Sequence, residues 1–352
     1  MLIVDGGESA FFRFFLYVKK IYLCKINNKI IPMSTNDFDS AAWLEKFRAA
    51  QNAQEDLHGL RAEIFQNTVS LVKAGGYRLE NDFIKIDNDG VTKNTEFFTV
   101  PAPLSGTVRF RSTSFSAIEA DCLETAGLLI SAGFNPCVLN MASRQNPGGG
   151  VVGGAGAQEE NIFRRTNLFM SLYQFVDYST KYGIARSENS YPLERKSGGI
   201  YSPEITVFRG SEQNGYYLLQ KPFNVSFVTV PAINRPALDM IDGKYRISSA
   251  LVEPTKEKMR VILRIAGKYM HDSLVLGAFG CGAFCNPPEH VAELFLEVFY
   301  EDEFASRFKF VSFPVLDDHN TYKSHNPEGN ALPFHKVFNN VAINHIQREK
   351  NQ

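Results

Sequence analysis

The sequence predicts an α/β domain in which helices flank a central sheet. Short apolar segments with strand composition alternate along the chain with amphipathic segments of helical period, a pattern typical of layered α/β folds. The chain has 352 residues, of which 44% are hydrophobic and 21% charged, so it can bury a sizeable core. This length fits one large domain with an accessory part.

The first predicted elements are helical. Between residues 41 and 74, apolar side chains recur at three-, four- and seven-residue steps, which places them on one helix face. Residues 77–86 and 107–112 then have the composition of strands. Ser116 and Glu119 have the spacing of a capping box, which predicts that a helix begins there.

The second half of the chain continues the alternation of strands and helices. A short apolar strand over residues 137–141 leads into a glycine-rich stretch, and helical period resumes at residue 159. The remaining predicted elements are strands over 204–208, 224–233, 273–279 and 308–316, and helices over 252–270 and 287–300.

Charge and cysteine content exclude several classes of protein. The net charge is −1 and the isoelectric point is near 6.7, so no global positive charge attracts polyanions. A nucleotide-like ligand must therefore be held by a local site. The five cysteines have no zinc spacing, and we expect thiols in a reducing compartment. Asp317, Asp318 and His319 follow a predicted strand, and we expect a solvated turn rather than a metal site.

Two glycine-rich loops follow apolar strands. One is NPGGGVVGG, from Asn146 to Gly154, and the other is LGAFGCGAF, over residues 276–284. Ligands of open α/β sheets collect beyond the carboxyl ends of strands, where glycine backbone presents N–H groups to phosphate oxygens. The two loops together predict one extended anionic ligand that lies across both.

Other nucleotide and hydrolase motifs fit poorly. Gly148, Gly150 and Gly153 formally match the dinucleotide fingerprint. However, the helix starts too late after the last glycine, and Asp177 ends a helix instead of a strand. No Walker A lysine follows either loop, and no nucleophile elbow is present.

The first loop leads directly into two adjacent acids, Glu159 and Glu160. Successive helix residues point about 100° apart, so the two side chains cannot share one task. Beside a phosphate loop, one acid can bind sugar hydroxyls while the other reaches a scissile oxygen. The alternative is that both only favour the helix dipole, or that one pairs with Arg164.

Together, the triple glycine, seven intervening residues and Gln-Glu-Glu resemble the signature of the bacterial-type poly(ADP-ribose) glycohydrolases, which are macrodomain enzymes. The Gly-Cys-Gly of the second loop, followed by an aromatic residue, is similar to the diphosphate loop of that family. The resemblance covers roughly residues 80–320. It implies a macrodomain-like mixed sheet flanked by helices, with an N-terminal helical accessory region.

The resemblance also implies roles for individual residues. Glu160 is the implied catalytic residue, Glu159 binds and orients the ribose, and Gln158 supports the turn. Phe284 lies against the adenine side, and either Asn140, Ser143 or Asn146 contacts the distal ribose. The implied substrate-binding positions are Asn140, Asn146, Gly148, Gly149, Gly150, Gln158, Gly280, Cys281, Gly282, Ala283 and Phe284.

The implied activity is hydrolysis of the ribose–ribose O-glycosidic bonds of poly(ADP-ribose), mainly from chain ends. Such a reaction passes through an oxocarbenium-like centre. Because adjacent acids on one helix cannot flank the bond, we expect Glu160 to act first as acid and then as base, without metal or cofactor. We further expect the charge of Glu159, and the substrate diphosphate, to favour its protonated form. The alternatives are a hydrolase of single ADP-ribose units on protein or nucleic acid, and a non-catalytic ADP-ribose-binding macrodomain.

We divide the chain into an extension of unknown role (residues 1–33), a helical accessory region with leading strands (34–112) and a macrodomain-like catalytic domain (113–345). The apolar stretch near the start is interrupted by Arg13 and fits neither a signal peptide nor a membrane span. We therefore expect an intracellular, soluble monomer of the cytoplasm or nucleus. Its predicted partners are poly(ADP-ribose) and ADP-ribosylated proteins as substrates, with ADP-ribose as product.

Overall fold

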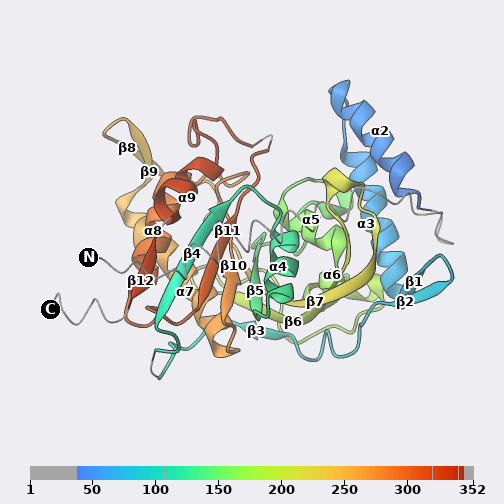
Figure 1. The fold of residues 1–352 in the computed structure, drawn as a ribbon, viewed down its shortest axis with the longest axis horizontal. Coiled ribbons are helices and arrows are strands. Elements are labelled where there is room, and N and C mark those ends of the chain that lie inside the picture. Colours follow the sequence, from blue (N-terminus) through green and yellow to red (C-terminus); the bar gives the residue numbers. More distant parts are fainter. Residues whose placement is uncertain (1–37, 107, 319, 340, 345–352) are drawn as a thin grey trace, which may run out of the picture.

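The computed structural model describes residues 38–106, 108–318, 320–339 and 341–344; the extension predicted for residues 1–33 lies outside them. An eight-stranded mixed sheet crosses the molecule and carries helices on both faces (Figure 1). This arrangement confirms the predicted α/β fold. The strand order is β12-β4-β11-β10-β5-β7-β6-β3. Their bounds are β3 (Glu96–Phe98), β4 (Ser112–Ile118), β5 (Pro136–Met141), β6 (Gly199–Arg209), β7 (Leu218–Val230), β10 (Ser273–Val275), β11 (Phe310–Pro314) and β12 (Ala342–Asn344).

The parallel strands of this sheet direct their carboxyl ends to one edge. β4, β11, β10, β5 and β7 pair in parallel, whereas β6 is antiparallel to β7, so β6 begins where β7 ends. Both glycine loops therefore leave the sheet at the same edge, one after β5 and one after β10. Such an edge is where open α/β sheets bind ligands.

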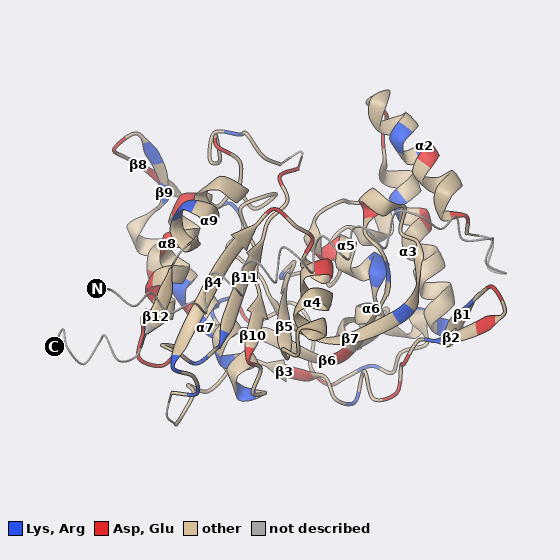
Figure 2. Cartoon of the chain, viewed as in Figure 1, with Lys and Arg blue, Asp and Glu red and all other residues tan. Residues whose placement is uncertain are grey.

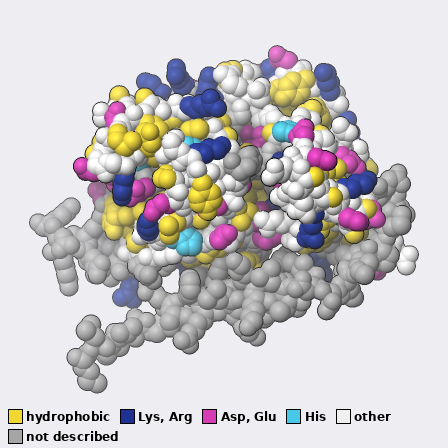
Figure 3. Space-filling model, turned by 90° about the horizontal axis from the view of Figure 1, so that it is seen from above, with side chains coloured by type: hydrophobic (Ala, Val, Ile, Leu, Met, Phe, Trp, Pro, Cys, Tyr) yellow, Lys and Arg dark blue, Asp and Glu magenta, His cyan; other side chains and the backbone are white. Residues whose placement is uncertain are grey.

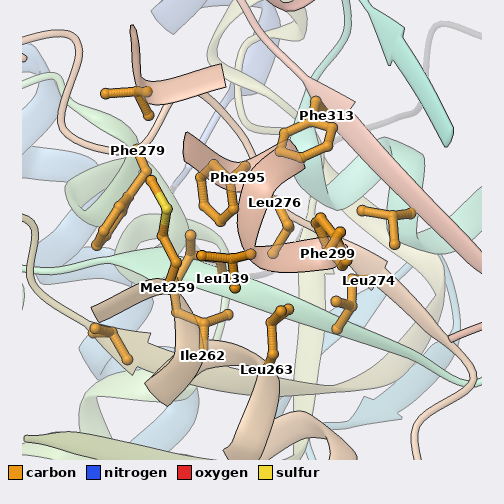
Figure 4. Packing of buried hydrophobic residues seen from close by; sticks show 14 of the residues in the cluster. Leu139, Met259, Ile262, Leu263, Leu274, Leu276, Phe279, Phe295, Phe299 and Phe313 are labelled. Atoms are coloured by element: carbon orange, nitrogen blue, oxygen red, sulfur yellow. The ribbon is translucent and has the colours of Figure 1, made fainter. Parts of the chain in front are cut away.

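The two faces of the sheet are buried against different helices. Along β5, Leu139 joins the core that contains Met259 and Ile262 of α7 (Figure 4). The preceding residue, Val138, joins the opposite core, which contains Leu123 of α4. Successive strand residues point to opposite faces, so a continuous apolar strand is expected between two helical layers. The first face carries α7 (Ser249–Lys268), α8 (Pro288–Phe299) and α9 (Ala331–Phe338), and the second carries α3 (His58–Lys73), α4 (Cys122–Ser131), α5 (Gln158–Arg165) and α6 (Leu168–Tyr173).

The N-terminal part differs from the prediction at two turns. The helical pattern over residues 41–74 forms two helices, α2 (Ser40–Asn52) and α3, because Gln54 between them has a left-handed backbone with φ of 56°. The strand composition over residues 77–86 forms a hairpin of β1 (Gly76–Leu79) and β2 (Asp82–Lys85). The accessory region also supplies β3, which pairs with β6 at the edge of the main sheet.

The predicted helix start at Ser116 is wrong. Of the strand predicted over residues 107–112, residues 108–111 form no strand, Ser112 begins β4, and residue 107 lies outside the described residues. Ser116 lies inside β4, whose register against β11 is continuous from Ser114 to Ile118. The helix begins after Asp121 instead, whose Oδ1 accepts hydrogen bonds of 2.9 Å from the N–H groups of Leu123 and Glu124. Pairing with β11 outweighs the local capping pattern at Ser116.

Two smaller features were not predicted from the sequence. A hairpin of β8 (Leu238–Ile241) and β9 (Lys244–Ile247) projects beside α8, as Figure 1 shows. The helical stretch that follows Glu159 is divided into α5 and α6 by extended backbone at Thr166. Within the described part of the chain, no helix combines the length and the apolar character needed to cross a membrane.

Candidate active site

The glycine loop after β5 folds back over the start of α5. Gly148 and Gly149 have φ values of 78° and 53°, a conformation that side chains other than glycine rarely adopt. A Cβ on Gly148 would also lie 2.6 Å from the ring of Phe163. A Cβ on Gly149 would overlap Glu160 Oε1. The two glycines are therefore required both for the turn and for the approach of the loop to α5.

Gln158 joins the start of α5 to the end of β5. Its Oε1 accepts a 2.9 Å hydrogen bond from the N–H of Met141, and its Nε2 donates one of 2.7 Å to the carbonyl of Leu139. The same Nε2 lies 3.8 Å from Cys122 Sγ at the start of α4. Figure 2 shows acidic residues where α4 and α5 begin. Gln158 thus fixes the first turn of α5 at the carboxyl edge of the sheet.

Glu159 is almost completely buried and is held by three donors. Its Oε2 accepts a 2.7 Å hydrogen bond from the N–H of Ser143, and its Oε1 accepts bonds from the Gly148 N–H at 3.0 Å and from Asn140 Nδ2 at 3.4 Å. Burial raises the pKa of this carboxyl to about 8, and the charge of Glu160 contributes in the same direction.

Glu160 has a different environment. Its Oε1 accepts a 2.9 Å hydrogen bond from the N–H of Gly150, whereas its Oε2 is buried and has no hydrogen-bond partner. The Oδ1 of Asn140 is likewise buried and unpaired. Unpaired buried polar atoms are costly, so native sites retain them chiefly where a ligand or water completes them. Glu159 is thus engaged with the protein, while Glu160 keeps one oxygen available.

The second glycine loop forms a wall of a cavity of about 520 Å³ that also touches Gln158. Gly280, Gly282, Ala283 and Phe284 line the cavity. Cys281 differs from the sequence prediction, because its side chain is fully buried in the core instead of facing the cavity. A volume in this range suits a small organic ligand such as a nucleotide.

Known proteins resemble this chain in both sequence and fold. Residues 65–210 match the model of the microbial-type PARG catalytic domain. The poly(ADP-ribose) glycohydrolase of Thermomonospora curvata, bound to the inhibitor ADP-HPD, is 29% identical with a TM-score of 0.61, covering 79% of this chain and 99% of that one. The poly(ADP-ribose) glycohydrolase of Deinococcus radiodurans in complex with ADP-ribose is 25% identical with a TM-score of 0.54. That match covers 73% of this chain and 100% of the Deinococcus chain. Residues 65–210 thus match a microbial-type PARG catalytic domain, and the fold of the chain is similar to that of bacterial poly(ADP-ribose) glycohydrolases.

The family match confirms the resemblance seen in the sequence. The family model spans the first glycine loop and Gln-Glu-Glu, while the second loop lies beyond its last matched residue, 210. No curated protein matches the chain by sequence.

Several residues that line the cavity were not predicted from the sequence as site residues. Glu119 and Asp121 line the cavity at the end of β4, and Asp121 also pairs with the buried Arg165 of α5 at 2.6 Å. Arg61 and Glu212 line the same cavity and form a bidentate ion pair with two 2.8 Å hydrogen bonds. Each pair joins elements far apart in the sequence, so no local motif marks it.

Other candidate residues are exposed or have structural partners. Asn146 is exposed, and its carbonyl accepts a hydrogen bond from the N–H of Gly149. Arg164 does not pair with Glu160, since its Nη1 donates to the carbonyl of Ala155 at 2.8 Å. Asp317 Oδ1 accepts from the N–H of Asn330 and so supports the start of α9, while His319 lies outside the described residues. In the described chain, no three His, Cys, Asp or Glu side chains are grouped to hold a metal.

Proposed function

We propose that this chain hydrolyses the ribose–ribose O-glycosidic bonds of poly(ADP-ribose), mainly from chain ends, and that Glu160 is the general acid and then the general base. The observation that carries the proposal is the state of the Glu160 carboxyl. One oxygen is fixed by Gly150, and the other is buried and unpaired beside the loop. A carboxyl oxygen in this state is suited to give a proton to a leaving oxygen and then to accept one from water.

Glu160 acts alone in proton transfer because Glu159 is not placed to share it. Both Glu159 oxygens are occupied by N–H donors from the loop and from Asn140. In most glycosidases two carboxyl groups lie on opposite sides of the scissile bond. Here the two glutamates are adjacent in one helical turn and both lie next to Gly149. One group must therefore serve in both steps.

Glu159 orients the distal ribose in this proposal. The carboxyl is held rigidly, and burial raises its pKa to about 8, so near neutral pH it can donate to or accept from a sugar hydroxyl. Its neighbour Asn140 retains an unpaired Oδ1, which is suited to accept a further sugar hydroxyl proton. Fixed contacts to the ribose place its anomeric carbon against Glu160.

The cavity beside the second loop takes the ADP portion. The wall formed by this loop includes Gly280 and Gly282, whose backbone a diphosphate can approach closely. Phe284 supplies a partly buried aromatic wall suited to a nucleobase. On the face seen in Figure 3, basic, acidic and apolar side chains are interspersed, and the net charge of the chain is −1, so a local site of this kind suits recognition of an anionic ligand.

The test is to incubate the protein separately with poly(ADP-ribose) and with a singly ADP-ribosylated protein, and to separate the products by size. We expect free ADP-ribose from the polymer at early times, before short chains accumulate. Early accumulation of short chains would show internal cleavage. Release only from the singly modified protein would identify a mono-ADP-ribosyl hydrolase, and binding without cleavage of either substrate would identify an ADP-ribose-binding module.

A further inference from the structure

The carboxyl edge of the sheet has a definite order of features. Residues at or after the ends of β4, β11, β10 and β5 line the cavity, including Met141, Glu119, Leu316 and Gly280, whereas the segment after β7 contributes Ala232 alone. Glu159 lies over the end of β5, as its bonds from the N–H groups of Ser143 and Gly148 show, and Glu160 follows it in the first turn of α5. An extended substrate with its released unit in the cavity would therefore continue past the glutamates toward β7 and β6.

Three basic residues gather on that side. Arg144 immediately follows Ser143, and its Nη1 donates a 3.1 Å hydrogen bond to the carbonyl of Leu193. Arg195 is exposed on the same turn, just before β6 begins. Lys258 of α7 lies close enough to interact electrostatically with Arg144, Arg195 and Glu194. Three separate segments thus contribute one positive charge each to one place.

The positive charge of this group is offset only in part, by the carboxyl group of Glu194. No ion pair joins Arg144, Arg195 or Lys258 to any acidic residue that the structure describes. Glu194 is the nearest acid, but its Oε2 accepts from the N–H groups of Lys196 and Ser197, at 2.7 and 2.6 Å. These hydrogen bonds hold the Glu194 carboxyl group against the backbone of its own turn.

Lys258 is the most unusual member of the group. Its side chain is only 4% exposed, and none of the described residues forms a hydrogen bond with its ammonium group. Burial lowers the pKa of Lys258 to about 8, and the two arginines lower it further while Glu194 opposes them. A buried lysine near two other cations is unfavourable for the free protein, and an anion bound between them would remove that cost.

We propose that Arg144, Arg195 and Lys258 bind the diphosphate of the ADP-ribose unit on the leaving side of the scissile bond. The inference rests on the proposed function, since only a polymer presents a second diphosphate at that position. The group lies beyond the glutamates from the cavity, so it contacts the part of the chain that remains after cleavage. It therefore favours polymer over ADP-ribose without contributing to the binding of the released unit.

The experiment compares wild type with Arg195→Ala and Lys258→Met, using poly(ADP-ribose) turnover and calorimetric binding of ADP-ribose. We expect the KM for polymer to rise about fivefold in Arg195→Ala and about tenfold in Lys258→Met, the usual range for an exposed and a buried charged contact. The Kd for ADP-ribose should be unchanged in both. Arg78→Ala, which removes an exposed arginine from β1, is the matched control and should alter neither quantity.

The outcomes separate the inference from the proposed function. If wild type releases no ADP-ribose from polymer, both fail. If wild type is active and Arg195→Ala keeps the wild-type KM, the leaving-side site is rejected and the proposed function stands. If the Kd for ADP-ribose rises in these variants by the same factor as the KM for polymer, the leaving-side site is also rejected. The cations would then bind the released ADP-ribose unit itself. Arg195 is exposed and makes no side-chain hydrogen bond to the described residues, so this variant tests the site even if Lys258→Met folds poorly.

Discussion

Glu160 Oε1 accepts a 2.9 Å hydrogen bond from the backbone N–H of Gly150, ten residues earlier in the chain. This bond ties the last residue of the Gln-Glu-Glu sequence to the last residue of the triple glycine. The bond holds Oε1 in place, while Oε2 of the same carboxyl group is buried and has no hydrogen-bond partner. The spacing between the two motifs therefore has a direct geometric purpose, because it sets which oxygen remains available for the reaction.

Replacing Glu160 with glutamine should abolish hydrolysis and leave ADP-ribose binding largely intact. The amide fills the same space and can still accept from Gly150, but it cannot deliver a proton. General acid–base groups contribute about a hundred- to ten-thousand-fold in rate. Turnover of poly(ADP-ribose) and calorimetric binding measure the two effects. Glu45→Gln, at an exposed position on α2, is the control, and near-full activity of Glu160→Gln would remove Glu160 from the mechanism.

Gly149→Ala should inactivate the protein while the fold survives. The new Cβ would overlap Glu160 Oε1 and would require a left-handed backbone at φ of 53°, so the carboxyl group must shift. Small misplacements of reacting groups can cost about a hundredfold in rate. Gly153→Ala is a matched control in the same loop, since a Cβ there meets nothing within 4 Å. Equal activity of the two variants would contradict the role given to Gly149.

The stability of the protein should depend on pH through Glu159. Burial raises the pKa of this carboxyl from 4.5 to about 8 in the folded state, so the folded protein binds an extra proton between these values. The stabilisation is complete below pH 4.5 and is lost as pH rises to about 8, with a slope of up to ~1.4 kcal/mol per pH unit. Denaturant unfolding of wild type and Glu159→Gln at pH 5, 6.5 and 8 measures it. As pH rises, the free energy of unfolding should fall less steeply in Glu159→Gln than in wild type. If the two proteins show the same dependence on pH, Glu159 is ionised throughout this range.

The loop and its two acids could be predicted from sequence because they are contiguous. An apolar strand, three glycines and Gln158 to Glu160 all lie within residues 137–160, and each has a local conformational requirement. The role of Glu160 as general acid was proposed from the resemblance of this contiguous motif to a family signature. The unpaired Oε2 of Glu160 could not be predicted, since it depends on how the loop folds back onto α5.

The rest of the site depends on contacts that local patterns do not encode. Arg61 and Glu212 meet across 151 residues of chain, and the basic group over β7 and β6 is assembled from three segments. The start of α4 at Asp121 was missed because Ser116 has the local spacing of a cap but is held in β4 by its pairing with β11. In these places tertiary pairing overrides local preference.

Phe284 and Phe279 lie in the same glycine loop and should respond differently to truncation. Phe284 is partly buried and lines the cavity. Phe279 is 1% exposed and packs in the core, where its ring centroid lies 6.1 Å from that of Phe295. Phe284→Ala should weaken ADP-ribose binding by about 1–3 kcal/mol, the usual worth of base–aromatic stacking. Phe279→Ala should destabilise the fold by about 3–5 kcal/mol.

Thermal melting and ADP-ribose titration of both variants separate the two roles. Phe284 also packs against the edge of the core, so a small decrease in melting temperature is compatible with a place in the cavity. What decides is affinity in the folded fraction, because core packing alone does not alter the binding of ligand by molecules that remain folded. If Phe284→Ala lowers the melting temperature as much as Phe279→Ala while its affinity for ADP-ribose stays at the wild-type value, Phe284 is a core residue and adenine lies elsewhere in the cavity.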